Sequence, residues 1–259
     1  SSTARKNITK RVIEVFASSQ QNNSGSWTDL FFIKQLLQEK HGIFNGNISF
    51  YDHHSTHQIY GELIKNWDNC ISLSYDGGGE SDSTVLSVIV DRRKKVLKRH
   101  KWPNSLGHFY STFTGYLGFK MLEGEYKMMG LAPYGKPIFK DKILSEILTL
   151  KNDGGYKLNA NICDYHSALK GDFHKKMTSL FGPKRLDNEK PSQNHINLAA
   201  SVQSAFETCL KHILSPALNN YPDIRKLVIT GGCALNVTAN GNLISNKIVD
   251  EVIIPPAPH

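Results

Sequence analysis

The sequence predicts an α/β fold. Short runs rich in β-branched and other apolar residues alternate along the chain with longer segments of helical periodicity. Two of the short runs, at 71–75 and 226–230, end in glycine-rich turns, which is typical of strands that stop abruptly. The chain has 259 residues, enough for one large domain or two moderate ones.

The N-terminal part is predicted to be mostly helical. Apolar residues at helical spacing indicate a helix over 4–18, and a polar loop follows at 20–26. Thr28 or Asp29 can cap a second helix. A short strand is then expected at 48–51, with a helix from the following histidines, beginning near Ser55, to about residue 66.

The middle of the chain mixes both element types. We expect a strand over 71–75 and a hairpin of strands 84–90 and 96–100, joined across a charged turn. Helical periodicity follows over 107–119, at the start of 124–135 and over 141–150.

The C-terminal part begins with a segment of low periodicity. Residues 151–192 are rich in Lys, Asp, Asn and Gly, and we expect an inserted or mobile region. A long amphipathic helix is predicted over 199–218. A strand at 226–230, a helix at 234–245 and a strand at 248–254 complete the pattern.

Composition excludes some classes of protein. The chain is 39% hydrophobic and 21% charged, and it lacks a run of 18 apolar residues, so we expect no transmembrane helix. The net charge of +8 favours an anionic partner, but the basic clusters do not interleave with aromatic residues, so nucleic acid is not the expected one. Four scattered cysteines without a CxxC pair, and no visible secretory signal, predict a reducing, cytoplasmic setting.

Two histidines stand four residues apart in Tyr-Asp-His-His-Ser-Thr-His at 51–57. Residues i and i+4 of a helix share a face, so the imidazoles of His53 and His57 can point the same way. Neutral imidazole binds zinc, iron, copper or nickel, and such a pair needs one or two further ligands. Ordinary surface histidines also show this spacing, so the motif alone leaves both interpretations open.

Glycine-rich turns follow two predicted strands, at Asp76–Glu80 and at Gly231–Gly232. Glycine lets backbone N–H groups approach a phosphate closely, and a following helix N-terminus adds favourable charge. Two such turns suggest two lobes that close on a nucleotide. Asp76 and Glu80 would then hold a metal or a hydroxyl, and Asn236 could reach the phosphates or the base. Plain tight turns, or an Asx turn at Asp76, are the simpler alternatives.

Six motifs occur in order along the chain. They are His-His-Ser-Thr-His at 53–57, Tyr-Asp-Gly-Gly-Gly-Glu at 75–80, Ser-Leu-Gly at 105–107, Gly-Glu-Tyr-Lys-Met-Met-Gly-Leu-Ala-Pro-Tyr-Gly at 124–135, Ala-Ala-Ser-Val-Gln at 199–203 and Gly-Gly-Cys-Ala-Leu-Asn at 231–236. The series resembles the NodU/CmcH-type carbamoyltransferases, specifically their larger transferase domain. The resemblance spans residues 48–258, and its fourth and longest motif is specific.

This resemblance implies an enzyme, a carbamoyltransferase, with the actin-like fold of the actin and sugar-kinase superfold (ASKHA). That fold has duplicated RNase H-like lobes, and we expect the chain to be incomplete at both ends. In the family, carbamoyl phosphate and ATP give carbamoyl-adenylate in a separate YrdC-like domain. The actin-like domain then moves the carbamoyl group to a hydroxyl of a small-molecule or glycan acceptor. The implied cofactors are Fe2+ or another divalent metal and ATP or carbamoyl-adenylate.

The family motifs also assign roles to individual positions. His53 and His57 match the iron-ligating HxxxH, and His54 matches its extra histidine, for which we expect a role in orienting the ligands. Asp76 is the predicted general base, at a strand end that faces the cleft. The predicted nucleotide and carbamoyl-adenylate site comprises Gly77, Gly78, Gly79, Glu80, Glu125, Lys127, Gly231, Gly232 and Asn236.

The resemblance divides the chain into four parts. These are a helical segment of the first lobe at 1–47, the first-lobe core leading into the nucleotide motif at 48–135, an insertion or mobile specificity region at 136–192, and a truncated second-lobe core at 193–259. The family's third metal ligand, an aspartate, is expected just after His259, and its opening His-Asp strand and YrdC-like domain are not found. We therefore expect this chain alone to be inactive, with exposed apolar edges near 48–51 and 71–75.

Two alternatives remain at this point. The threonylcarbamoyl-adenosine enzyme of tRNA modification shares the fold and the HxxxH motif, and would explain the basic charge. Its nucleotide motif differs from residues 124–135, so it ranks second. A non-catalytic nucleotide-binding module is the third interpretation.

Overall fold

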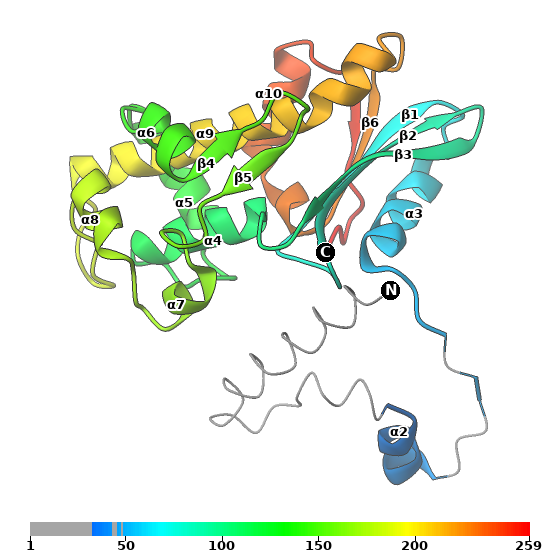
Figure 1. The fold of residues 1–259 in the computed structure, drawn as a ribbon, viewed down its shortest axis with the longest axis horizontal. Helices are drawn as coiled ribbons and strands as arrows, with labels where there is room; N and C mark the ends of the chain where they lie inside the picture. Colours follow the sequence, from blue (N-terminus) through cyan, green and yellow to red (C-terminus); the bar gives the residue numbers. More distant parts are fainter. Residues whose placement is uncertain (1–32, 43–45, 48) are drawn as a thin grey trace. The chain divides into compact units, whose positions relative to one another are not determined.

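The computed structural model describes residues 33–42, 46–47 and 49–259, which divide into two units, Ser1–Asp52 and His53–His259 (Figure 1). The first unit contains helix α2 (Ile33–His41), the described part of the second predicted helix. The predicted helix at 4–18 and the loop at 20–26 lie outside the described residues. The prediction of a strand at 48–51 is wrong for residues 49–51, because these residues have no strand partner and form no regular structure. Phe50 and Tyr51 are exposed.

A five-stranded mixed sheet organises the second unit (Figure 1). Its strands are β1 (Cys70–Tyr75), β2 (Asp82–Val90), β3 (Arg93–Lys101), β6 (Lys226–Thr230) and β7 (Glu251–Ile253). Their order is β3-β2-β1-β6-β7. The first three strands form an antiparallel meander, and β6 and β7 are parallel to β1. Leu73 of β1 fixes the register, opposite Leu86 on one side and Ile229 on the other.

The parallel pairing of β1 with β6 joins two distant parts of the chain. The segments 48–135 and 193–259, predicted to belong to different lobes, contribute strands to one sheet. Because carboxyl ends of neighbouring parallel strands meet at one edge, the turns at Asp76 and Gly231 lie side by side. The pairing links residues more than 150 positions apart, a contact that local sequence patterns do not reveal.

Strand β1 lies at the centre of this sheet, and all six of its residues are buried. The expectation of an exposed apolar edge at 71–75 is therefore wrong, because β2 covers one edge and β6 the other. The run Cys-Ile-Ser-Leu-Ser-Tyr places apolar side chains on alternate positions and small serines between them.

The hairpin of β2 and β3 turns more tightly than predicted. Asp91 and Arg92 form the turn with φ values of 48° and 63°. Two-residue hairpin turns favour this left-handed backbone because its twist matches that of the strands. Strand β3 begins immediately afterwards, although most of its residues are Lys or Arg. It is an edge strand, and charged side chains on an edge discourage pairing with other chains.

The two faces of the sheet are covered by different helices. Alternation along β6 directs Val228 and Thr230 towards α3 (His53–Lys65), whereas Leu227 and Ile229 join the main core. That core also contains the buried side of α9 (Gln193–Asn220), the long helix predicted from periodicity. Glycine at position 61 lets α3 approach β6 closely.

Further helices pack against α9 or against the carboxyl ends of β1 and β6. They are α4 (Leu106–Tyr116), α5 (Glu125–Leu131), the 3-10 helices η3 (Ala132–Tyr134) and η4 (Gly232–Leu235), and α10 (Val237–Ser245). The predicted helix at 234–245 thus starts later, after η4, and the predicted strand at 248–254 is shortened to β7. No helix among the described residues is long and apolar enough to cross a bilayer.

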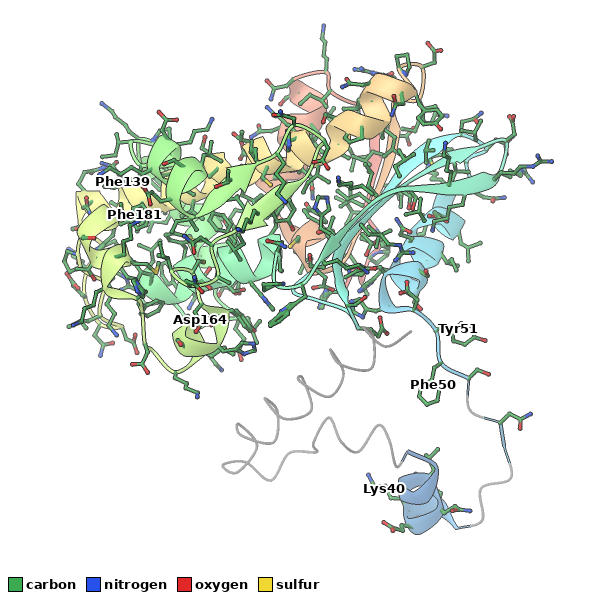
Figure 2. The ribbon with its side chains drawn as sticks, in the orientation of Figure 1. Lys40, Phe50, Tyr51, Phe139, Asp164 and Phe181 are labelled. Atoms are coloured by element: carbon green, nitrogen blue, oxygen red, sulfur yellow. The ribbon has the colours of Figure 1, made fainter. Side chains whose placement is uncertain are left out.

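The region predicted as an insertion is packed against the main core. It contains α6 (Lys140–Glu146), the two-stranded sheet of β4 (Leu148–Leu150) and β5 (Tyr156–Leu158), α7 (Tyr165–Leu169) and α8 (Lys175–Phe181). The helix predicted over 141–150 ends early because 148–150 pair with β5. Phe181 of α8 is buried, and its ring centroid lies 5.8 Å from that of Phe139 (Figure 2).

Gly61 should be critical for the packing of α3 against β6. A Cβ atom at this position would lie 2.6 Å from side-chain atoms of both Val228 and Thr230. We expect Gly61→Ala to destabilise the protein by about 1–3 kcal/mol, because the helix must move away from the sheet. Gly241→Ala in α10 is the matched control, since a Cβ there meets nothing within 4 Å and should be neutral or slightly stabilising. Equal losses in urea unfolding would contradict this account.

His100 should make stability depend on pH. Burial, followed by the nearby charge of Lys98, lowers the pKa of His100 to about 4. The unfolded chain binds this proton near pH 6.5, so stability should fall as the pH drops from about 6.5 towards 4, by at most about 3 kcal/mol. His100→Phe preserves a ring that can stack on Tyr156 and should remove this part of the pH dependence. Parallel unfolding curves for both proteins between pH 7 and 5 would refute the assignment.

Candidate active site

Three side chains meet where α3 begins and β1 ends. The Nε2 atoms of His53 and His57 lie 3.3 Å and 3.2 Å from Oδ2 of Asp76. The two Nε2 atoms are 3.2 Å from each other. All three side chains are partly buried, so the cluster is reachable from solvent but not fully hydrated.

The N-terminal part of α3 carries both histidines. The helix was predicted to begin near Ser55, but it begins at His53, so His57 follows His53 one turn later on the same face. The carboxylate of Glu80 accepts a hydrogen bond from the backbone N–H of His53, at 3.3 Å. An acidic group at this end of a helix satisfies an unpaired amide and interacts favourably with the helix dipole.

Asp76 follows β1 directly and is held by several bonds. Its Oδ1 accepts from the backbone N–H of Gly77 at 2.7 Å, and its carbonyl oxygen accepts from the Ser105 hydroxyl at 2.8 Å. Burial raises the pKa of the Asp76 carboxyl. Its hydrogen bonds with both histidines lower the pKa by more than burial raises it, so the pKa lies well below its usual range. The Gly77 amide acts in the same direction. The carboxylate of Asp76 is therefore held in its ionised form, and its role as the general base stays a prediction.

The donor set fits a divalent metal ion. Two ligands about 2.1 Å from a common ion, and about 90–110° apart, are about 3.0–3.4 Å from each other. The three separations in the cluster, 3.2 to 3.3 Å, fall in this range. Two imidazoles and one carboxylate on one side of a site are typical of non-haem Fe(II), with other positions left open. The family resemblance placed the third ligand just after His259, whereas the glycine-turn argument had offered Asp76 as a residue that holds a metal or a hydroxyl. In the structure Asp76 is the neighbour of both histidines.

His54 points away from this cluster and is buried. Its Nδ1 lies 2.7 Å from the Ser74 hydroxyl, and its Nε2 lies 3.0 Å from the carbonyl oxygen of Asp82. Both ring nitrogens are thus engaged with the sheet, and burial lowers the pKa of His54. The geometry favours a role in orienting α3 and does not place His54 among the reacting groups.

Close backbone approaches hold the turns of the site together. A Cβ at Gly231 would lie 2.3 Å from the carbonyl oxygen of Tyr75, and the φ of 89° there also favours glycine. A Cβ at Gly107 would lie 2.8 Å from the backbone nitrogen of Gly77, and one at Gly79 would lie 3.0 Å from the Cβ of His53. These glycines act by permitting contact between turns.

A cavity of about 400 Å³ opens beside Asp76. It lies within the size range of small-molecule sites. Of the residues predicted for the nucleotide site, it is lined by Gly77, Glu125, Gly232 and Asn236. The structure therefore joins the metal-binding motif, the first glycine turn, the long motif at 124–135 and the last motif in one place.

Other predicted residues do not line this cavity. The turns after β1 and β6 contain four of them, Gly78, Gly79, Glu80 and Gly231. Lys127 is exposed and lies over the ring of Tyr126, at 5.8 Å from its centroid. Residues two apart on a helix point in different directions, so Lys127 does not line the cavity with Glu125. Contact of Lys127 with a nucleotide stays a prediction.

Two of the cavity residues already have bonds within the protein. Asn236 caps α10 by accepting from the N–H of Ala239, and its side-chain amide exchanges two hydrogen bonds with Gln203. The Glu125 carboxylate accepts from the Ser111 hydroxyl at 2.6 Å and from the N–H of Leu122 at 2.8 Å. Direct contact of Glu125 or Asn236 with a nucleotide stays a prediction.

An aromatic wall of the cavity was not predicted from the sequence. The rings of His108 and Tyr165 stack with centroids 3.8 Å apart and planes 12° from parallel. His108 follows the Ser-Leu-Gly motif directly, which was a usable signal. Tyr165 begins α7 within the segment of low periodicity, where no motif indicates a site.

The comparison with known proteins identifies the family. Residues 6–259 match the family model described as Carbamoyltransferase N-terminus, and the chain belongs to this family. The resemblance drawn from the six motifs is thus confirmed.

Relatives are found in several bacteria. The chain is 37% identical over 211 residues to an uncharacterized protein of Synechocystis sp., covering 80% of this chain and 34% of that protein. It is 28% identical over 250 residues to nodulation protein NolNO of Sinorhizobium fredii, covering 96% and 35%. Nodulation protein NolO of Bradyrhizobium diazoefficiens is 28% identical over 215 residues, covering 80% and 36%. The chain spans about a third of the length of these curated relatives.

Proposed function

We propose that the protein transfers a carbamoyl group from carbamoyl-adenylate to a hydroxyl of a small-molecule or glycan acceptor. The observation that carries this proposal is the cluster of His53, His57 and Asp76 at the edge of a cavity of about 400 Å³. Membership of the carbamoyltransferase family supports the type of group transferred.

The topology supports an actin-like fold. A sheet of three antiparallel strands followed by two parallel ones, in the order β3-β2-β1-β6-β7, is the arrangement expected of an RNase H-like lobe. We therefore assign His53–His259 to one such lobe of an ASKHA protein. The second glycine turn then belongs to the same lobe as the first.

We assign the metal site to His53, His57 and Asp76, with Fe2+ or another divalent ion as the occupant. When bound, such an ion supplies Lewis-acid polarisation of a carbonyl or phosphoryl oxygen. Asp76 balances part of its charge and, held by Gly77, keeps the site rigid. The positions of the two imidazoles on successive turns of one helix face fix their orientation before any ligand arrives.

The cavity suits the adenylate. Backbone amides of glycine turns can hold phosphate oxygens, and Gly232, in the turn after β6, lines the cavity. The Gly77 amide is already bonded to Asp76 and serves to hold that carboxylate. Its apolar walls, among them Tyr126 and Met129, suit a purine ring. The adenylate would then lie with its phosphate near Asp76 and its carbamoyl group beside the cluster.

The transfer itself exchanges one bond for another. The acceptor hydroxyl oxygen attacks the carbamoyl carbon, the bond from that carbon to the phosphate oxygen breaks, AMP leaves, and the hydroxyl proton passes to solvent water. Asp76 does not take the hydroxyl proton in this scheme, because its carboxylate is engaged by both histidines. Its contribution is to hold the cluster in place.

We also propose the wider setting. Carbamoyl phosphate would be consumed by a YrdC-like domain to supply the adenylate, and nucleic acid is not a required partner. The four cysteines are buried and free, which supports a reducing compartment such as the cytoplasm.

Metal content tests the proposed ligands. We expect the purified protein to carry about one equivalent of divalent metal, and the double variant His53→Ala, His57→Ala to carry almost none, because one carboxylate cannot hold the ion. His41→Ala removes an exposed histidine in α2 and should leave the content unchanged. Elemental analysis of the three proteins decides the matter, and equal content in all of them would sink the assignment.

Turnover tests the proposed reaction. Expressed at the full length of its relatives, and given synthetic carbamoyl-adenylate and a hydroxylated acceptor, the protein should release AMP as it transfers the carbamoyl group. Asp76→Asn should lower the rate by about a thousandfold, because it disrupts the cluster as a unit. Lys127→Ala should change it by less than about twofold, since Lys127 lies outside the cavity. A large loss with Lys127→Ala would restore the nucleotide role that the sequence suggested.

A further inference from the structure

The turn between α4 and α5 forms part of the cavity rim. Leu122, in the middle of this turn, lines the cavity and is 66% exposed. Its φ is 69°, in the left-handed region. A branched or bulky side chain is disfavoured there because Cβ crowds the following carbonyl oxygen. Strained residues of this kind persist only when neighbouring structure fixes them, and they gather at ligand clamps.

Glu125 fixes Leu122 from one side. A single carboxylate oxygen, Oε1, accepts from the Leu122 N–H at 2.8 Å and from the Ser111 hydroxyl at 2.6 Å. The carboxylate therefore connects the turn to α4 and to the start of α5. Gly124 makes this closure sterically allowed, because a Cβ there would lie 2.7 Å from the carbonyl oxygen of Lys120.

Arg185 fixes the other end of the turn. Its guanidinium is buried and donates to the carbonyl oxygens of Leu117 and Gly118, the latter at 2.8 Å. It also lies over the ring of Phe119, at 4.7 Å from the centroid. With both ends anchored, the exposed Leu122 is an apolar side chain held in place at the cavity mouth.

The position of Ser111 on α4 indicates which part of a ligand Leu122 contacts, because Ser111 and Leu122 bond the same oxygen of Glu125. Gly107 at the start of α4 touches the Asp76–Gly77 turn, and Ser111, which bonds Glu125, lies one helical turn further on. One turn of α-helix is about 5–6 Å, similar to the distance from a phosphate to the sugar and base of a nucleotide. Tyr126 and Met129 add apolar surface at this end.

We propose that Leu122 covers the base of the bound adenylate, and that Glu125 is a positioning residue that acts through Leu122. The identity of the ligand rests on the proposed function. The geometric role of Glu125 rests on its two hydrogen bonds alone. Glu125 thus serves the site without touching the nucleotide.

Hydrogen exchange of the Leu122 amide tests the positioning role without any ligand. In the wild type the carboxylate of Glu125 protects this amide, so Glu125→Ala should speed its exchange about tenfold or more. Glu125→Gln retains an acceptor oxygen and should preserve most of the protection. Ser111→Ala removes the other bond to the same oxygen and is the matched control, with Leu122 protection retained. Equal exchange in the wild type and in Glu125→Ala would overturn the role.

A double-mutant cycle on binding of AMP tests the route of the effect. Leu122→Gly relieves the left-handed strain and deletes the side chain, and we expect AMP to bind about tenfold more weakly. Glu125→Ala should cause a similar loss, with partial rescue by Glu125→Gln. Because both act through one side chain, the double variant should also lose only about tenfold.

The outcomes separate the two proposals. Independent losses that multiply to about a hundredfold would show that Glu125 contacts the nucleotide directly and would overturn the indirect role. Unchanged affinity with Leu122→Gly would overturn the covering role of Leu122. Failure of the wild type to bind AMP, with the Leu122 amide still protected by Glu125, would instead overturn the proposed nucleotide occupancy of the cavity.

Discussion

The parallel pairing of β1 with β6 is the contact on which the rest of the site depends. It brings the turns after Tyr75 and Thr230 to one edge of the sheet, where Gly231 approaches the Tyr75 carbonyl more closely than any other residue type allows. The same β6 strand provides the surface for α3, through Val228 and Thr230 against Gly61. The histidines on α3 and the carboxylate after β1 therefore meet only once this pairing has formed.

Local patterns predicted most elements but not their assembly. Helix α3, the β1 strand, the β2–β3 hairpin and α9 follow from periodicity and turn residues, and the HxxxH spacing correctly placed two imidazoles on one face. The charged strand β3 extended further than its composition suggested, because an edge strand tolerates lysine and arginine. Asp76 was a candidate to hold a metal or a hydroxyl, but its contact with the two histidines could not be predicted, since it arises from long-range packing alone.

The electrostatics of the cluster determine the protonation state of the Asp76 carboxylate. Asp76 was predicted to be a base because it is an acid at a strand end beside a cleft. In the fold, both histidines and the Gly77 amide bond its carboxylate, which favours the ionised form and weakens its pull on a proton. A carboxylate in that state is suited to balancing a cation. Function at such a position follows from the spatial neighbours of the side chain, which lie far from it in the sequence.

Polar contacts, not a large apolar face, set the orientation of α3. Its buried residues are His54, Gln58 and Gly61, while larger apolar side chains such as Leu63 are exposed. The Gln58 amide donates to the carbonyl oxygens of Ser72 and Val85, at 3.0 and 3.1 Å, and His54 bonds the same two strands. Buried hydrogen bonds have defined directions, and leaving one unmade is costly. A helix held this way has one favoured rotation about its axis, and that rotation aims His53 and His57 at Asp76.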